Sequence, residues 1–138
     1  MIDYAPEDLW RFLPIGYLLT VLVEGTILWF GLSPHHPPRR RLTAALWLTA
    51  CTYPIVVLVL PSAMAGFVRE DYLIVAETFA PAAECLLFWL AFGATSPDGR
   101  QTVVVRDYAA IIAANLASFA AGESTAIRRL IELLIGAD

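Results

Sequence analysis

The sequence from residue 42 to residue 61 is LTAALWLTACTYPIVVLVLP, a run that contains no charged side chain. Its second half, from Pro54 to Leu60, is rich in β-branched residues and in water would suggest a strand. A helix of about 20 residues matches the thickness of a bilayer, and in lipid the backbone must satisfy its own hydrogen bonds. The stretch therefore predicts a transmembrane helix.

Two other stretches have the same character. Residues 12–31 carry one charged side chain, Glu24, and residues 72–93 carry two, Glu77 and Glu84. At a helical rise of about 1.5 Å per residue, each is long enough to cross a hydrocarbon layer of about 30 Å. We therefore expect both to be transmembrane helices.

The last part of the chain gives weaker signals. Residues 102–122 are long enough to span only if Arg106 extends to the headgroups, and a re-entrant or bundle-buried helix is the alternative. Residues 124–137 place apolar side chains at helical spacing with Arg128 and Arg129 between them. This pattern predicts an amphipathic helix at the membrane interface or on a partner, with a frayed tail as the alternative.

The composition favours the same class of protein. Apolar residues make up 59% of the chain, against about 45–50% in soluble domains, and charged residues 16%, against about 25%. A net charge of −4 argues against a nucleic-acid partner. We predict an all-α, polytopic membrane helical bundle in a single domain, residues 1–138. It has about four transmembrane helices, arranged as two similar hairpins, and a C-terminal amphipathic helix.

The basic residues indicate an orientation. Residues 33–41 contain two prolines that end the first helix and a run of three arginines, and residues 94–106 contain Arg100 and Arg106. Arginine is enriched in cytoplasmic loops. We expect a multi-pass protein of the cell inner membrane with both of these loops in the cytoplasm.

The two halves of the chain look alike. In each half, a glutamate within a helix is followed five residues later by a tryptophan: Glu24 and Trp29, Glu84 and Trp89. Residues 49–53 can be aligned with residues 115–119, which gives two helical hairpins in parallel orientation. A duplication and a chance likeness both remain open at this stage.

Two short elements carry a resemblance to a known group. Glu77 and Glu84 match an E-x6-E element. An N/T-x-x-S/T-aromatic element is matched in the helix before them by Thr49, Thr52, Tyr53 and Pro54, and in the helix after them by Asn115, Ser118 and Phe119. The pattern resembles a group of small bacterial inner-membrane proteins with four helices. It departs at Thr49, where Asn is expected, and at Tyr53, where His is expected. The resemblance implies the architecture and implies no activity.

Three intramembrane acids are the candidate sites for a proton or a cation: Glu24, Glu77 and Glu84. A carboxyl group at the centre of a bilayer costs at least about 2.5–3.5 kcal/mol and needs a partner or a role. Glu77 and Glu84 share a helix face, with Pro81 between them. In one interpretation the acids line a polar path; in the other, which we favour, they hydrogen-bond to facing helices and set the register.

Polar side chains on the second and fourth helices are the candidates for helix contacts. Thr49, Thr52 and Tyr53 share one face, and Asn115 and Ser118 share another, at spacings of three and four residues. Hydroxyl and amide groups commonly connect helices in lipid, so we expect helix packing here and not ligand binding.

We predict no metal site and no catalytic residue. His35 and His36 are adjacent, so they do not share a face, and the sequence shows no third ligand nearby. Cys51 and Cys85 are isolated in apolar stretches. Motifs of nucleotide binding and of serine hydrolases are absent from the sequence. We therefore expect a protein that is not an enzyme, and the sequence leaves its cofactors unknown.

Two function classes follow from these features. In the first, the chain is a structural, accessory or assembly subunit of a larger membrane complex. Its short loops favour this class, and its partners would be the lipid bilayer and other membrane-protein subunits, or itself. In the second, it is a small homo-oligomeric transporter or channel coupled to protons or cations, which uses the intramembrane glutamates.

Overall fold

The computed structural model describes residues 6–93 and 103–124. Over these residues the chain is helical and contains no strand, which confirms the all-helical prediction for this part. The elements in order are α1 (Pro6–Gly31), α2 (Pro38–Pro54), the π-helical segment η1 (Ile55–Val59), α3 (Leu60–Ala63), α4 (Arg69–Phe92) and α5 (Val105–Glu123).

The helices differ from the predicted apolar ranges mainly at their starts. The helix that contains residues 42–61 begins at Pro38, because proline is favoured in the first turn, where its missing N–H leaves no bond unmade. The arginines predicted to lie in the loop 33–41 therefore lie in the first turn of α2. The predicted amphipathic helix at 124–137 lies, apart from Ser124, outside the described residues, as does most of the loop 94–106.

The π-helical segment η1 interrupts the long helix that α2 begins. It is flanked by Pro54 and Pro61, neither of which has an N–H to donate. In a π-helix, the N–H of residue i+5 donates to the carbonyl of residue i. The carbonyl of Val56 would therefore need an N–H at position 61, which Pro61 lacks. The hydroxyl of Tyr72, in α4, donates to that carbonyl instead, with an O···O distance of 3.0 Å. A contact between helices thus supplies the donor that Pro61 lacks.

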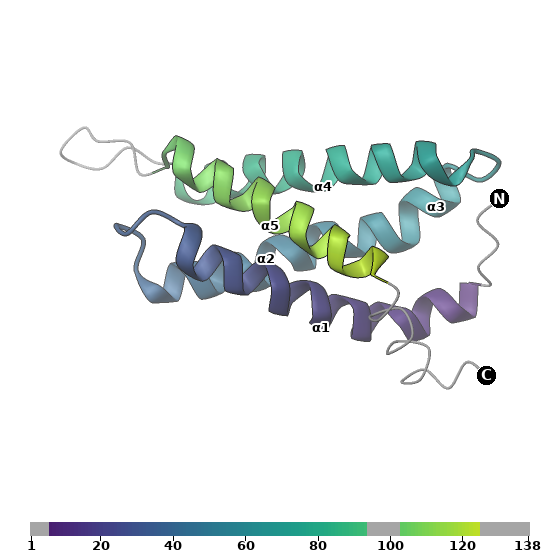
Figure 1. Cartoon of the computed structure of the whole chain (residues 1–138), viewed down its shortest axis with the longest axis horizontal. Helices are drawn as coiled ribbons and strands as arrows, with labels where there is room; N and C mark the ends of the chain where they lie inside the picture. Colours follow the sequence, from purple (N-terminus) through teal and green to yellow (C-terminus); the bar gives the residue numbers. More distant parts are fainter. Residues whose placement is uncertain (1–5, 94–102, 125–138) are drawn as a thin grey trace.

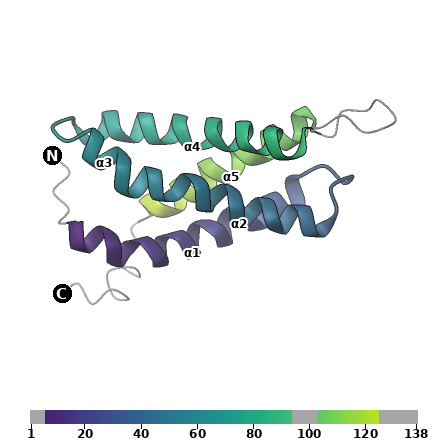
Figure 2. The same cartoon turned by 180° about the vertical axis from the view of Figure 1, so that it is seen from behind.

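The four long helices form one bundle in which sequence neighbours are antiparallel (Figure 1). Helix α1 packs on α2 and α5, and α4 packs on the same two helices, so α1 and α4 occupy opposite corners (Figure 2). The turn between α1 and α2 lies at the same end as the start of α5 and the end of α4. The start of α4 and the end of α5 meet at the other end, where Arg69 donates to Glu123 with an N···O distance of 2.6 Å.

The bundle is packed through small and aliphatic side chains and covered by large apolar ones. The buried core consists of Leu28, Leu32, Ala44, Ala45, Leu48, Phe88, Val103, Ala110, Ile111 and Ala114. The outer faces of the helices expose, among others, Leu18, Leu22, Phe30, Leu46, Ile74, Leu86, Leu90, Ile112 and Leu116. So much exposed apolar surface would be unusual in water and is expected in lipid.

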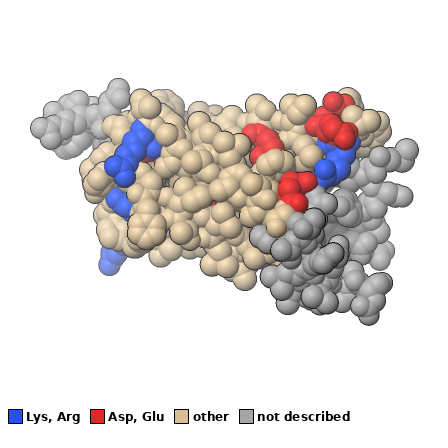
Figure 3. Space-filling view, viewed as in Figure 1, with Lys and Arg blue, Asp and Glu red and all other residues tan. Residues whose placement is uncertain are grey.

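Three of the described helices are long and apolar enough to cross a membrane: Leu13–Gly31, Pro38–Ala63 and Arg69–Phe92. Helix α5 is not among them, and its 19 residues include Arg106, Asp107 and Glu123. In the space-filling view, arginines mark both ends of the molecule, and much of the surface between them is uncharged (Figure 3). The structure is therefore consistent with a membrane protein.

Candidate functional site

Two acids in the long apolar helices are buried at the centre of the bundle. Glu24 in α1 is 2% exposed, and Glu84 in α4 is 1% exposed. The carboxyl group of Glu24 accepts hydrogen bonds at 2.7 Å from the hydroxyl of Thr49, in α2, and at 2.7 Å from the hydroxyl of Ser118, in α5. Glu24 therefore connects its own helix to both neighbours.

Glu84 does the same from the opposite corner. Its carboxyl group lies 2.7 Å from the hydroxyl of Thr52, in α2, and accepts a hydrogen bond at 2.7 Å from the side-chain amide of Asn115, in α5. Because both acids reach both central helices, the six side chains connect all four helices of the bundle.

The contacts of the two acids are equivalent under the alignment of the two halves. That alignment relates Glu24 to Glu84, Thr49 to Asn115 and Thr52 to Ser118. The four hydrogen bonds then form two equivalent pairs: Glu24–Thr49 with Glu84–Asn115, and Glu24–Ser118 with Glu84–Thr52. Each acid thus has one partner in its own half of the chain and one in the other half.

The hydroxyl groups around the acids have a second neighbour. The hydroxyl of Thr52 lies 3.1 Å from the carbonyl of Leu48, as well as 2.7 Å from Glu84. A hydroxyl carries one proton, so it cannot donate to both. The amide of Asn115 has two protons, and it has two acceptors, Glu84 at 2.7 Å and the carbonyl of Ile111 at 3.1 Å. All these contacts are satisfied together when Glu84 carries a proton and donates it to Thr52.

Two predicted site residues lie outside this network. Glu77 is half-buried on α4, and among the described residues it has no hydrogen-bond partner. Tyr53 packs edge to face on Tyr17, with 6.1 Å between the ring centroids. The structure therefore brings together Glu24, Glu84, Thr49, Thr52, Asn115 and Ser118, and leaves the other two apart.

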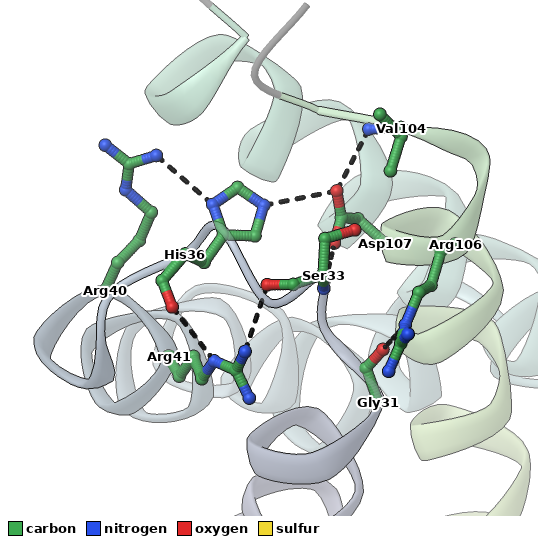
Figure 4. A network of polar contacts seen from close by, with 8 residues as sticks. All are labelled: Gly31, Ser33, His36, Arg40, Arg41, Val104, Arg106 and Asp107. Carbon is green, nitrogen blue, oxygen red and sulfur yellow. Dashed lines mark hydrogen bonds and ion pairs between the residues drawn. The ribbon is translucent and has the colours of Figure 1, made fainter.

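A second polar cluster lies at the turn between α1 and α2 (Figure 4). Asp107, in the first turn of α5, has no exposed surface. Its carboxylate accepts from the backbone N–H of Ser33 at 2.7 Å and from the backbone N–H of Val104 at 2.9 Å. The bond from Val104 satisfies a backbone N–H at the start of α5 that has no partner within the helix. The bond from Ser33 attaches the turn after α1 to α5.

His36 is the centre of this cluster and is 1% exposed. Its Nε2 lies 3.1 Å from Oδ2 of Asp107, at ion-pair distance but without the geometry of a direct hydrogen bond. The guanidinium of Arg40 lies 3.2 Å from Nδ1, and Phe88 packs edge-on against the ring. Burial lowers the pKa of His36 below its ordinary value, and the neighbouring Asp107 opposes that shift.

Two arginines donate hydrogen bonds to backbone carbonyls at the carboxyl end of α1. Arg106 donates to the carbonyls of Gly31 at 2.8 Å and Phe30 at 3.3 Å. Arg41 donates to the carbonyl of Ser33 at 3.0 Å and also to that of Trp29. The last carbonyls of a helix have no partner within the helix, so these side chains supply the missing donors.

The sequence pattern indicated the residues of the acid network, which are Glu24, Glu84, Thr49, Thr52, Asn115 and Ser118. It did not indicate the turn cluster around His36 and Asp107. Asp107 is not among the residues that the sequence pattern indicates. An acid in the first turn of a helix was the available signal for the start of α5. Nothing in the local sequence indicated that Ser33 and His36 would lie against it.

Comparison of the chain with protein-family models, with curated proteins and with solved structures finds no match.

Proposed function

We propose that this chain is an integral membrane protein with four transmembrane helices that serves as a structural, accessory or assembly subunit of a larger membrane complex. Three helices have the required length and apolarity. The 19 residues of α5 extend over about 29 Å at the rise of an α-helix, close to the thickness of a bilayer core. Its antiparallel packing between α1 and α4 supports a fourth crossing.

The equivalent contacts of Glu24 and Glu84 support an origin by duplication of one helical hairpin. The exposure of the paired positions agrees as well: Leu28 is 1% exposed and its counterpart Phe88 is 0% exposed. In this interpretation the two hairpins are held together through bonds that each acid makes to the other half.

The observation that carries the subunit proposal is that both buried acids have neutral partners on facing helices. Such bonds set helix register and need no ligand. Two surface grooves between α1 and α2 are lined mainly by apolar residues, and neither includes Glu24 or Glu84. The broad apolar outer surface then remains available for lipid or for other subunits.

A second candidate is a homo-oligomeric transporter coupled to protons or cations. The favourable observation is that two carboxyl groups lie in one polar network that connects four helices. Buried acids in membrane helices often mark ion pathways. A single bundle of four helices encloses little space, so this candidate requires several copies of the chain.

One experiment separates the two candidates. The protein is extracted gently from its native membrane and its mass and companions are read by native mass spectrometry. Stoichiometric companions of a different mass support the subunit proposal. A homo-oligomer without companions contradicts it.

Flux measurements in proteoliposomes then test the second candidate. We expect no proton or cation flux that depends on Glu24 or Glu84. The matched variants are Glu24→Gln and Glu84→Gln, with Glu70→Gln as the control, because Glu70 is exposed at the start of α4. A flux that both network variants abolish, while the control and the oligomeric state are unchanged, favours the transporter.

A further inference from the structure

The fold assembles three potential metal ligands that are not recognisable as a group in the sequence. His35 and His36 lie in the turn after α1, and Asp107 lies in the first turn of α5. One donor atom from each residue lies within 4.8 Å of the other two. His36 and Asp107 are buried and His35 is exposed. The third ligand that the adjacent histidines lacked in the sequence is thus supplied by a distant helix.

The distance between the two buried donors suits a shared ion. Zinc binds imidazole nitrogen at about 2.0–2.1 Å and carboxylate oxygen at about 2.0–2.2 Å. At bond angles between octahedral and tetrahedral values, two such donors are separated by about 2.9–3.4 Å. Nε2 of His36 and Oδ2 of Asp107 are 3.1 Å apart. The separation of this pair is therefore the one expected for two donors that share one ion.

The contact of the buried nitrogen with Asp107 is not well aligned. Nε2 of His36 has no hydrogen bond that meets normal geometry among the described residues. A buried nitrogen whose polar contact is poorly aligned is uncommon in folded proteins. An ion bound to Nε2 would explain it. His35 is exposed and its ring centroid lies 4.2 Å from that of His36, so the third donor is already close to the buried pair.

We propose that His35, His36 and Asp107 bind one divalent transition-metal ion of the Zn²⁺ class, with the remaining coordination position open to water. Two imidazoles and a carboxylate are ligands that suit this class. The two backbone N–H groups that bind Asp107 hold its carboxylate in place, as outer-shell donors do in metal sites. The ion would link the turn after α1 to α5, and this role is independent of the proposed function.

Arg40 competes with the ion. Its guanidinium donates to Nδ1 of His36, which requires Nδ1 to be unprotonated and places the ring proton on Nε2. A metal bound to Nε2 displaces that proton, so Nδ1 carries the proton and Arg40 must move away. Arg40 also lies over the ring of Phe92, 5.1 Å from its centroid, and can keep that contact. The proposal therefore predicts that removing Arg40 strengthens metal binding.

The test uses the full chain in detergent, purified with an affinity tag that contains no histidine. Zn²⁺ is titrated by calorimetry, and two-bond ¹H–¹⁵N spectra record the tautomers of the histidine rings. The chain contains only two histidines, so both rings can be assigned from His35→Asn alone. We expect one equivalent of Zn²⁺ to bind and the His36 ring to change to the form protonated at Nδ1.

The variants define the site. His35→Asn and Asp107→Asn should each weaken Zn²⁺ binding by at least about tenfold, since even outer-shell changes cost about that much. Arg40→Gln should bind Zn²⁺ more tightly than the unsubstituted chain, and Glu70→Gln, at the other end of the bundle, should bind it equally well. His35 is exposed, so His35→Asn tests the site without endangering the fold.

Three results would overturn the proposal. The first is the absence of saturable binding. The second is binding that His35→Asn leaves unchanged. The third is binding that Asp107→Asn leaves unchanged in a variant that still folds by circular dichroism, which would mean that the ion is bound without Asp107.

Discussion

At the scale of single residues, the partners of Glu84 explain how an acid is tolerated inside an apolar bundle. The hydroxyl of Thr52 and the amide of Asn115 are both within 2.7 Å of its oxygens. A protonated carboxyl group satisfies every donor and acceptor around it. The side chain then behaves as a neutral polar link between helices, which costs far less in lipid than a charge.

This view predicts different outcomes for two substitutions of Glu84. Glu84→Gln should change the free energy of unfolding by less than about 1 kcal/mol, because the amide can donate to Thr52 and accept from Asn115. Glu84→Leu should destabilise by about 1–3 kcal/mol, since it leaves the buried amide of Asn115 with an unsatisfied proton. The measurement is thermal unfolding in detergent micelles.

Glu77→Leu is the matched control for Glu84→Leu, because Glu77 lies two turns away on the same helix and has no hydrogen-bond partner among the described residues. Glu77→Leu should unfold close to the temperature of the unsubstituted chain. If Glu84→Gln were as unstable as Glu84→Leu, the neutral link would be wrong and a charged role for Glu84 would be favoured.

The residues of the acid network were predictable by type, but their pairing was not. Acids in apolar runs and hydroxyls at helical spacing predicted polar contacts between helices. The sequence did not indicate that Thr52 would bind Glu84 while Thr49, one turn away, would bind Glu24. Pairing depends on which helix faces lie opposite each other, and helix spacing within one chain segment carries no information on that.

At the scale of helices, close approach between α1 and α5 depends on Gly31. A Cβ at this position would lie 2.9 Å from the Cβ of Ala110, which is closer than side chains normally pack. We expect Gly31→Ala to destabilise the protein by about 1–3 kcal/mol, because the two helices must separate. The same unfolding measurement in detergent checks it.

Gly122 provides the control for this substitution. A Cβ at Gly122 would meet no atom within 4 Å, so Gly122→Ala should have no destabilising effect. A gain of up to about 1 kcal/mol is possible there, because alanine has a higher helix propensity than glycine. Equal stability of Gly31→Ala and the unsubstituted chain would contradict the close contact of α1 with α5.

The π-helical segment η1 makes a separate prediction. Tyr72→Phe removes the donor to the carbonyl of Val56, which Pro61 cannot replace. We expect a loss of about 0.5–1.5 kcal/mol in the free energy of unfolding. Tyr108→Phe is the control, since the Tyr108 hydroxyl has no hydrogen bond among the described residues. If both variants were equally stable, the Tyr72 hydroxyl would not support η1.

At the scale of the whole molecule, the proposed arrangement of four crossings predicts which positions are reached from outside the cell. Single cysteines are placed at Pro34, Phe67 or Gly122, all exposed, after Cys51 and Cys85 have been changed to alanine. An impermeant thiol reagent is then applied to right-side-out vesicles. We expect Phe67→Cys and Gly122→Cys to be labelled and Pro34→Cys to be protected, because arginines are enriched in cytoplasmic loops and Pro34 lies beside a run of three.

Each alternative gives a different labelling pattern. Labelling of Pro34→Cys with protection of the other two would reverse the orientation. Labelling of Phe67→Cys with protection of Gly122→Cys would mean that α5 does not cross, which leaves the three spans that length and apolarity alone support. Labelling in inside-out vesicles should give the complementary result.

The sequence by itself determined that the chain is helical and which of its segments are apolar enough for a membrane, because both properties follow from composition and spacing within one segment. The tertiary structure decided the partners: Glu84 with Asn115 and Thr52, and Asp107 with Ser33. It also decided that the arginines at 41 and 106 complete the end of α1. These contacts join residues far apart in the chain, so they exist only once the helices have packed.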